Sequence, residues 1–185
     1  MTDPGLPGPS ALLISGTVGA GKTSTAEAVG AWLALRGVPG AVIDLDWLRR
    51  CWPSPPGDRF NVAVEIENLT AVAAIYLRAG ARRIVLAGVL EDPTVRPAYA
   101  HAVGVPLVVC RLQVDLAVVR RRLRRRHEGQ PVDLAWHLHR SGELDAILRS
   151  VNAEDFTIDA TDLTPLETVT AVVRAAGWDE DPRWS

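Results

Sequence analysis

The apolar residues of this chain fall into five short, continuous runs separated by longer segments with helical spacing. The runs consist mainly of Val, Ile, Leu and Ala and lack the alternation of a half-exposed strand, which is typical of strands buried on both faces. The predicted strands cover residues 11–15, 41–45, 83–87, 106–112 and 156–159. Strands that alternate with helices predict a three-layer α/β fold, in which helices cover both faces of a parallel sheet.

Composition and charge predict a single soluble domain. A chain of 185 residues, 48% of them hydrophobic, is long enough to bury one core. Its net charge of −2 gives no general attraction to nucleic acid or to an anionic membrane. No apolar run approaches the ~18 residues of a membrane span, and residues 1–10 lack a signal-peptide core. We expect a cytoplasmic monomer or homodimer without nucleic-acid or membrane partners, with one domain at 10–178, a flexible tail at 1–9 and a second tail at 179–185.

The strongest functional signal surrounds Lys22, the one lysine among 20 lysines and arginines. It belongs to the segment Gly16-Thr17-Val18-Gly19-Ala20-Gly21-Lys22-Thr23, a full match to the phosphate-binding pattern G-x-x-x-x-G-K-[ST]. A predicted strand precedes the segment and a helical pattern follows it, as the motif requires. Loop N–H groups and the lysine ammonium hold phosphate oxygens, and the threonine hydroxyl supports Mg²⁺. We expect ATP to contact Gly16, Thr17, Val18, Gly19, Ala20, Gly21, Lys22, Thr23 and Ser24.

Two acids, Asp44 and Asp46, follow the second predicted strand. In an open parallel sheet, ligands gather outside the carboxyl ends of the strands. Phosphoryl transfer needs Mg²⁺, positive charge around the phosphates and a carboxylate that orients or deprotonates the attacking hydroxyl. We interpret Asp44 as a metal-site residue together with Thr23, and Asp46 as the catalytic carboxylate. The reverse assignment, and a role of either acid as a helix cap, stay open.

The chain resembles small-molecule kinases of the phosphate-loop superfamily, near adenylyl-sulfate kinases, chloramphenicol phosphotransferases and gluconate kinases. Ile43-Asp44-Leu45-Asp46-Trp47-Leu48-Arg49 is similar to the D-G-D-N-x-R stretch of adenylyl-sulfate kinases, and Asp58-Arg59-Phe60-Asn61 to their D-R-x-E-N. The resemblance implies a phosphate-loop NTPase fold with a small helical lid, and acceptor contacts from Asp44, Asp46, Arg49, Arg59 and Asn61. The F-I-S-P stretch and the lysine-bearing lid of adenylyl-sulfate kinases are absent, so the resemblance carries kinase chemistry without the sulfate acceptor.

Six arginines lie within the seven residues 120–126. Arg122 and Arg126 are four residues apart and share one helical face. The resemblance to gluconate kinases implies that this pair begins a mobile lid, at about residues 122–142, and neutralises charge on the transferred phosphoryl group. The other four arginines are expected on a solvated face. A nucleic-acid contact is the alternative, against which stand the net charge and an aromatic content of 5%.

Three further segments are candidates for the site. In the helix that begins near Asn61, a polar face of Asn61, Glu65 and Asn68 is either solvated or turned to a substrate. The apolar stripe of the same helix is expected at Ile66, Leu69, Ala73 and Tyr76. Trp47 and Trp52 are candidates for the lining of an acceptor pocket. Residues 159–163 follow the last strand, where related kinases place a loop against adenine.

These observations predict an ATP-dependent kinase that phosphorylates a hydroxyl of a small molecule. The catalytic residues are expected to be Lys22, Asp46, Arg122 and Arg126, and the cofactors ATP and Mg²⁺. A nucleoside or nucleotide kinase is one alternative. From another class of function, an ATP-binding switch or a partner-binding NTPase is the second.

Overall fold

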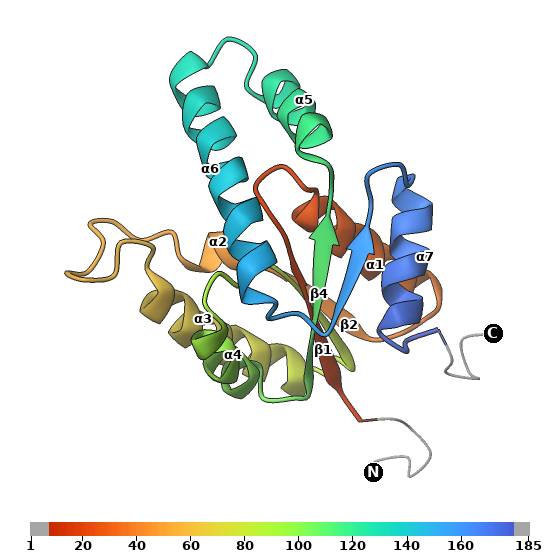
Figure 1. The fold of residues 1–185 in the computed structure, drawn as a ribbon. Coiled ribbons are helices and arrows are strands. Elements are labelled where there is room, and N and C mark those ends of the chain that lie inside the picture. The colour runs from red at the N-terminus through yellow and green to blue at the C-terminus, as the bar shows by residue number, and fades with distance from the viewer. Residues whose placement is uncertain (1–7, 180–185) are drawn as a thin grey trace.

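The structure is a computed structural model that describes residues 8–179. Within these residues, five parallel strands form one sheet in the order β2-β3-β1-β4-β5 (Figure 1). The strands are β1 (Ser10–Ser15), β2 (Gly40–Asp44), β3 (Arg83–Ala87), β4 (Leu107–Gln113) and β5 (Phe156–Asp159). Each lies within one residue of its predicted bounds, so the predicted parallel sheet is confirmed. The predicted tails, 1–9 and 179–185, lie almost entirely outside the described residues.

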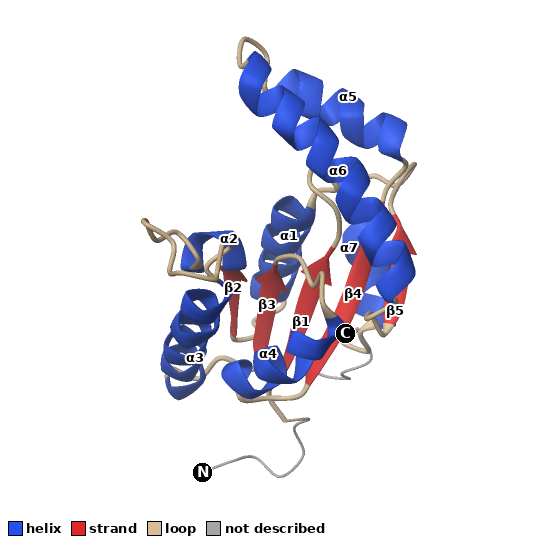
Figure 2. Cartoon of the chain, turned by 60° about the vertical axis from the view of Figure 1, so that its left-hand side comes forward, coloured by secondary structure: helices blue, strands red, loops and turns tan. Residues whose placement is uncertain are grey.

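Helices cover both faces of the sheet, as Figure 2 shows. On one face lie α1 (Lys22–Leu35) and α7 (Pro165–Ala175), and on the other α3 (Val62–Arg78) and α4 (Arg96–Val103). The central strand β1 serves both cores, because its successive side chains point to opposite faces. Leu12 and Ile14 pack in the core under α1 and α7, and Ala11 and Leu13 in the core under α3. The expected three-layer α/β fold is therefore confirmed.

A pair of helices stands over the carboxyl ends of the strands (Figure 1). It consists of α5 (Leu116–Arg126) and α6 (Pro131–Val151), joined by a short turn. The C-terminal part of α6 is bound to β4, because Arg111 donates to the Leu148 carbonyl (3.0 Å) and forms ion pairs with Asp145 and Glu154. The N-terminal part of α6 extends away from the sheet (Figure 1). The predicted lid at 122–142 falls within α5, α6 and the turn between them. None of the helices in residues 8–179 is long and apolar enough to cross a membrane.

Candidate active site

The phosphate-binding segment forms a loop between β1 and α1, at the carboxyl edge of the sheet. Two of its glycines are required by geometry. A Cβ at Gly16 would come within 2.6 Å of the Leu112 carbonyl oxygen. Gly21 precedes α1 in the left-handed region, at φ 104°. No side chain caps the N-terminus of α1, so the N–H groups of its first turn remain for an anionic ligand.

Lys22 begins α1 and turns back toward the loop. Its Nζ donates a hydrogen bond to the Thr17 carbonyl at 3.2 Å, and the Thr17 hydroxyl donates to the Ser141 carbonyl of α6 at 2.6 Å. Burial lowers the pKa of Lys22, while the charges of Asp46 and Asp44 act in the opposite direction. The loop is thereby linked both to the two acids and to the helical pair above it.

The two acids lie where β2 ends and the short helix α2 (Leu45–Leu48) begins. Asp44 caps α2, with its Oδ1 accepting from the Asp46 backbone N–H at 2.9 Å. Its other oxygen, Oδ2, accepts from the Thr23 hydroxyl at 2.7 Å. Cap and metal-site residue are thus compatible in Asp44, because each role uses a different carboxylate oxygen. The Asp46 side chain is 66% exposed and lines the cavity.

The polar face of α3 has a structural role that neither sequence interpretation anticipated. Asn61 donates from Nδ2 to the carbonyls of Arg49 and Cys51, both at 2.8 Å, and Asn68 donates to the Leu48 carbonyl at 2.7 Å. Both amides therefore hold the segment that follows α2. Asn61 is buried outside the cavity lining, which gives no support to the predicted acceptor contact.

Glu65, the third residue of that face, is fully buried and holds an arginine side chain. Its carboxylate forms an ion pair with the Arg49 guanidinium and accepts a hydrogen bond from the Tyr99 hydroxyl. Burial raises the pKa of Glu65, and the contacts with Tyr99 and Arg49 oppose this shift. Arg49 lines the cavity, with Nε 3.8 Å from Asp46 Oδ1, and its predicted contact with the acceptor stays a prediction. Arg59 is exposed and does not line the cavity, so its predicted acceptor contact is also unsupported.

The arginines of α5 separate into two groups. Arg122 donates to the Ala20 carbonyl of the phosphate loop at 3.1 Å. Arg126 lines the same cavity, close enough to Lys22 to act on its charge. Arg125 also borders the cavity, although its side chain is exposed as expected. Arg120, Arg121 and Arg124 are exposed, as expected.

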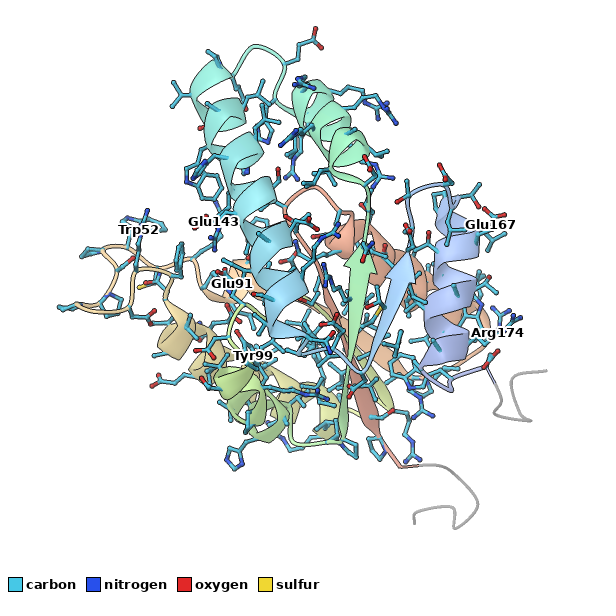
Figure 3. The ribbon with its side chains drawn as sticks, in the orientation of Figure 1. Trp52, Glu91, Tyr99, Glu143, Glu167 and Arg174 are labelled. Carbon is cyan, nitrogen blue, oxygen red and sulfur yellow. The ribbon has the colours of Figure 1, made fainter. Side chains whose placement is uncertain are left out.

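These residues surround one cavity of about 910 Å³ at the carboxyl edge of the sheet. Its nucleotide end is lined by the phosphate loop, by Asp44 and by Arg122, Arg125 and Arg126 of α5. Its other end, which we call the acceptor end, is lined by Asp46, Trp47, Arg49, Arg50, Phe60, Glu91, Trp136, His137 and Arg140. Trp52, also a candidate for this lining, is exposed on the loop between α2 and α3 and does not line the cavity (Figure 3).

Several residues of the acceptor end were not singled out from the sequence. Glu91 follows β3, and Phe60 lies in the loop before α3. Arg140 joins these segments, because its guanidinium pairs with Glu91 at 2.5 Å and with Glu143 at 2.7 Å and lies 5.4 Å from the Phe60 ring. The position of Glu91 just beyond a strand end was the available signal, since ligands gather at that edge.

A second cavity, of about 430 Å³, adjoins the phosphate loop on the opposite side of Arg122 and Arg125. Its lining includes Ala160 and Leu163, which belong to the segment after β5 expected to contact adenine. The wall is completed by Ser24, Thr25 and Ala28 of α1 and by Pro165 and Thr168 of α7. The volume and the mixed apolar and hydroxyl lining suit a heterocycle next to the phosphate-binding loop.

Comparisons with known proteins agree with this architecture. A family model described as an AAA domain matches residues 12–141, more than half of the chain. The structure of the tunicamycin resistance protein of Deinococcus radiodurans aligns with a TM-score of 0.64 and 22% identity, over 92% of this chain and 96% of that one. Shikimate kinase from Acinetobacter baumannii aligns with a TM-score of 0.60 and 14% identity, over 94% and 96%.

A gluconokinase from Sinorhizobium meliloti also aligns, with a TM-score of 0.56 and 19% identity, over 91% of this chain and 94% of that one. Comparison with curated protein sequences found no match. At these identities the solved structures establish the fold. The resemblance to phosphate-loop kinases, drawn from the sequence, is confirmed at that level.

Proposed function

We propose that this chain, which belongs to the AAA domain family, is an ATP-dependent kinase that phosphorylates a hydroxyl group of a small molecule. The observation that carries the proposal is the convergence of Lys22, the Thr23–Asp44 pair and Asp46 on one cavity. A phosphate loop by itself indicates nucleotide binding and does not distinguish a kinase from another NTPase. The additional carboxylate, open to the same cavity, supplies the group that a hydroxyl acceptor requires.

At the nucleotide end, the loop N–H groups and Lys22 would hold the phosphates, and the second cavity would hold the base. The hydroxyl of Thr23 and the carboxylate of Asp44 are 2.7 Å apart and offer the oxygen ligands that Mg²⁺ prefers. These two residues would hold the Mg²⁺ ion, which would supply positive charge to neutralise the phosphates. Arg122 and Arg126 add positive charge around the γ-phosphate.

At the junction of the two ends, Asp46 orients the acceptor hydroxyl and takes its proton. The acceptor oxygen forms a bond to the γ-phosphorus, the bond between that phosphorus and the β–γ bridging oxygen breaks, and ADP leaves. Asp46 suits this role because its side chain is open to the cavity, whereas both carboxylate oxygens of Asp44 are already engaged.

The test is ATP turnover with and without a panel of sugars, nucleosides, nucleotides and antibiotics. A kinase releases ADP faster when its acceptor is present, and mass spectrometry finds one added phosphoryl group on that compound. Slow hydrolysis that no compound stimulates and no compound captures would favour the switch or partner-binding NTPase instead. A nucleoside or nucleotide as the modified compound would identify the first alternative.

A further inference from the structure

Three aromatic side chains that line the acceptor end have large exposed surfaces. Trp47 is 67% exposed, Trp136 50% and Phe60 42%, and all three belong to the cavity lining. They come from α2, α6 and the loop before α3, so their presence in one cavity is a consequence of the fold. Exposed aromatic faces that gather around a few polar groups are typical of sites for ring-shaped ligands.

The charge of the acceptor end is compensated within the protein. Arg140 is paired with both Glu91 and Glu143, and Figure 3 shows these two acids along the side of α6 that faces the loop bearing Trp52. Arg49 is paired with the fully buried Glu65. An anionic group that approached either guanidinium would meet a carboxylate already in place.

The third arginine of this end, Arg50, is exposed and lies over the Trp47 ring, 4.4 Å from its centroid. Its charge is solvated and is therefore weakly attractive to an anion. Asp46 adds a negative charge beside the position of the acceptor hydroxyl. In contrast, Lys22, Arg122, Arg125 and Arg126 supply positive charge at the nucleotide end, where the phosphates need it.

We propose that the acceptor is an uncharged molecule whose ring stacks on the aromatic side chains of the acceptor end, such as a sugar or a nucleoside, and not a carboxylate or a phosphate ester. The inference rests on the proposed function and narrows its substrate class. Arg49 and Arg140 then act as hydrogen-bond donors to neutral oxygens, a role that a salt-bridged guanidinium still fills with its remaining N–H groups. Carboxylates that face the ligand also exclude anionic competitors by repulsion.

The first test compares matched pairs that differ in charge, with glucose against glucuronate and uridine against uridine monophosphate. Turnover is measured as ADP release and as phosphoryl transfer to the compound. We expect a phosphorylated compound to be the uncharged member of its pair, with kcat/KM at least about tenfold above its anionic partner. An anionic member that is phosphorylated more efficiently would overturn the inference.

The second test needs no turnover and uses the whole protein saturated with Mg²⁺ and a non-hydrolysable ATP analogue. Glucuronate and sulfate are then titrated by calorimetry into the wild type and into the double variant Glu91→Gln/Glu143→Gln, which frees Arg140. We expect no saturable anion binding in the wild type at millimolar concentration, and an affinity gain of about tenfold or more in the variant.

The control is Glu27→Gln/Glu67→Gln, which changes the net charge equally at two exposed positions outside the cavity. It should bind anions no better than the wild type. Saturable binding by the wild type, or the absence of a gain in the double variant, would overturn the inference. Failure of the ATP analogue to bind would remove the proposed function and the inference together, whereas analogue binding with a preferred anionic acceptor would remove the inference alone.

Discussion

At the nucleotide end, the cavity lining comes mainly from one continuous segment, residues 18–24, and from one face of α5. At the acceptor end, it comes from α2, the loop before α3, the segment after β3 and α6, with one to four residues from each. The first end has a backbone geometry that a short motif specifies, and in the proposed function it would bind the phosphates common to all nucleotides. The second consists of side chains that only the tertiary structure brings together, and it would bind the acceptor, which varies between enzymes.

Lys22→Ala should have the largest effect, because it removes the one ammonium that reaches the phosphates. We expect ATP turnover to fall by more than about 10³-fold, with little change in melting temperature, since the side chain contacts the loop and not the core. Lys22→Arg should also be poor, because a planar guanidinium does not replace a point charge. Turnover assays with circular-dichroism melting check both variants. Undiminished transfer by Lys22→Ala would refute the nucleotide end as described.

Asp46→Asn tests the junction of the two ends. The substitution keeps the shape and removes the charge, so ATP should still bind while kcat falls by about 10²–10⁴-fold, the range for loss of a general base. Asp44→Asn is the matched control, and it should shift the Mg²⁺ dependence of turnover because Asp44 holds Thr23. Wild-type rates in both variants would show that the two acids are only structural.

This contrast between the two ends explains what the sequence could predict. The loop at residues 16–24 and the acid Asp44 were singled out from local patterns, because a short motif specifies the loop and Asp44 ends a strand at the same edge of the sheet. The structural role of Glu65 was not predicted. Its position on a polar helical face gave no sign that its carboxylate would pair with Arg49 and accept a hydrogen bond from Tyr99.

Tyr76 was wrongly expected in the apolar stripe of α3. Its side chain is 39% exposed near the edge strand β2, while Leu69 and Ala73 are buried as expected. In the last turn of the helix, the neighbouring residue Leu77 packs against this core instead. The helical period predicted that one side of α3 is buried, but it did not fix which residue of the last turn turns inward.

Arg122→Ala examines whether α5 belongs to the nucleotide end. If the guanidinium stabilises charge in transfer, kcat should fall by about 10²–10³-fold, with a smaller change in ATP affinity. Arg121→Ala is the control, because its side chain is exposed on another face of the same helix. Equal losses at both positions, accompanied by salt-sensitive RNA binding, would instead indicate a nucleic-acid surface.

Glu65→Gln acts at the acceptor end alone. Without the carboxylate, Arg49 loses its partner and should become mobile, so the KM for the acceptor should rise about tenfold while ATP affinity stays constant. Because Glu65 is fully buried, we also expect a loss of stability toward the lower end of the ~3–5 kcal/mol that follows disruption of a buried ion pair. Acceptor kinetics measured well below the melting temperature separate the two effects. An unchanged KM would show that Arg49 does not contact the acceptor.

The smallest expected effect concerns the pH dependence of α6 beside the acceptor end. The ring of His137 stacks on that of His127, with centroids 4.3 Å apart, and contacts Trp136 edge-on. Burial lowers the pKa of His137, as do His127 and Arg126, while Asp133 acts in the opposite direction. An unfolded histidine takes up its proton near pH ~6.5, whereas His137 in the folded protein does so only at lower pH. The unfolded state therefore binds more protons in that window, and the free energy of unfolding decreases as pH falls below ~6.5.

His137→Gln removes this contribution, and His139→Gln serves as the control because that histidine is exposed on the same helix. Between pH 7.5 and 5.5, the melting temperature of the wild type and of the control should decrease by about 1–2 °C more than that of His137→Gln. Equal pH dependence in all three proteins would show that protonation of His137 is not coupled to folding.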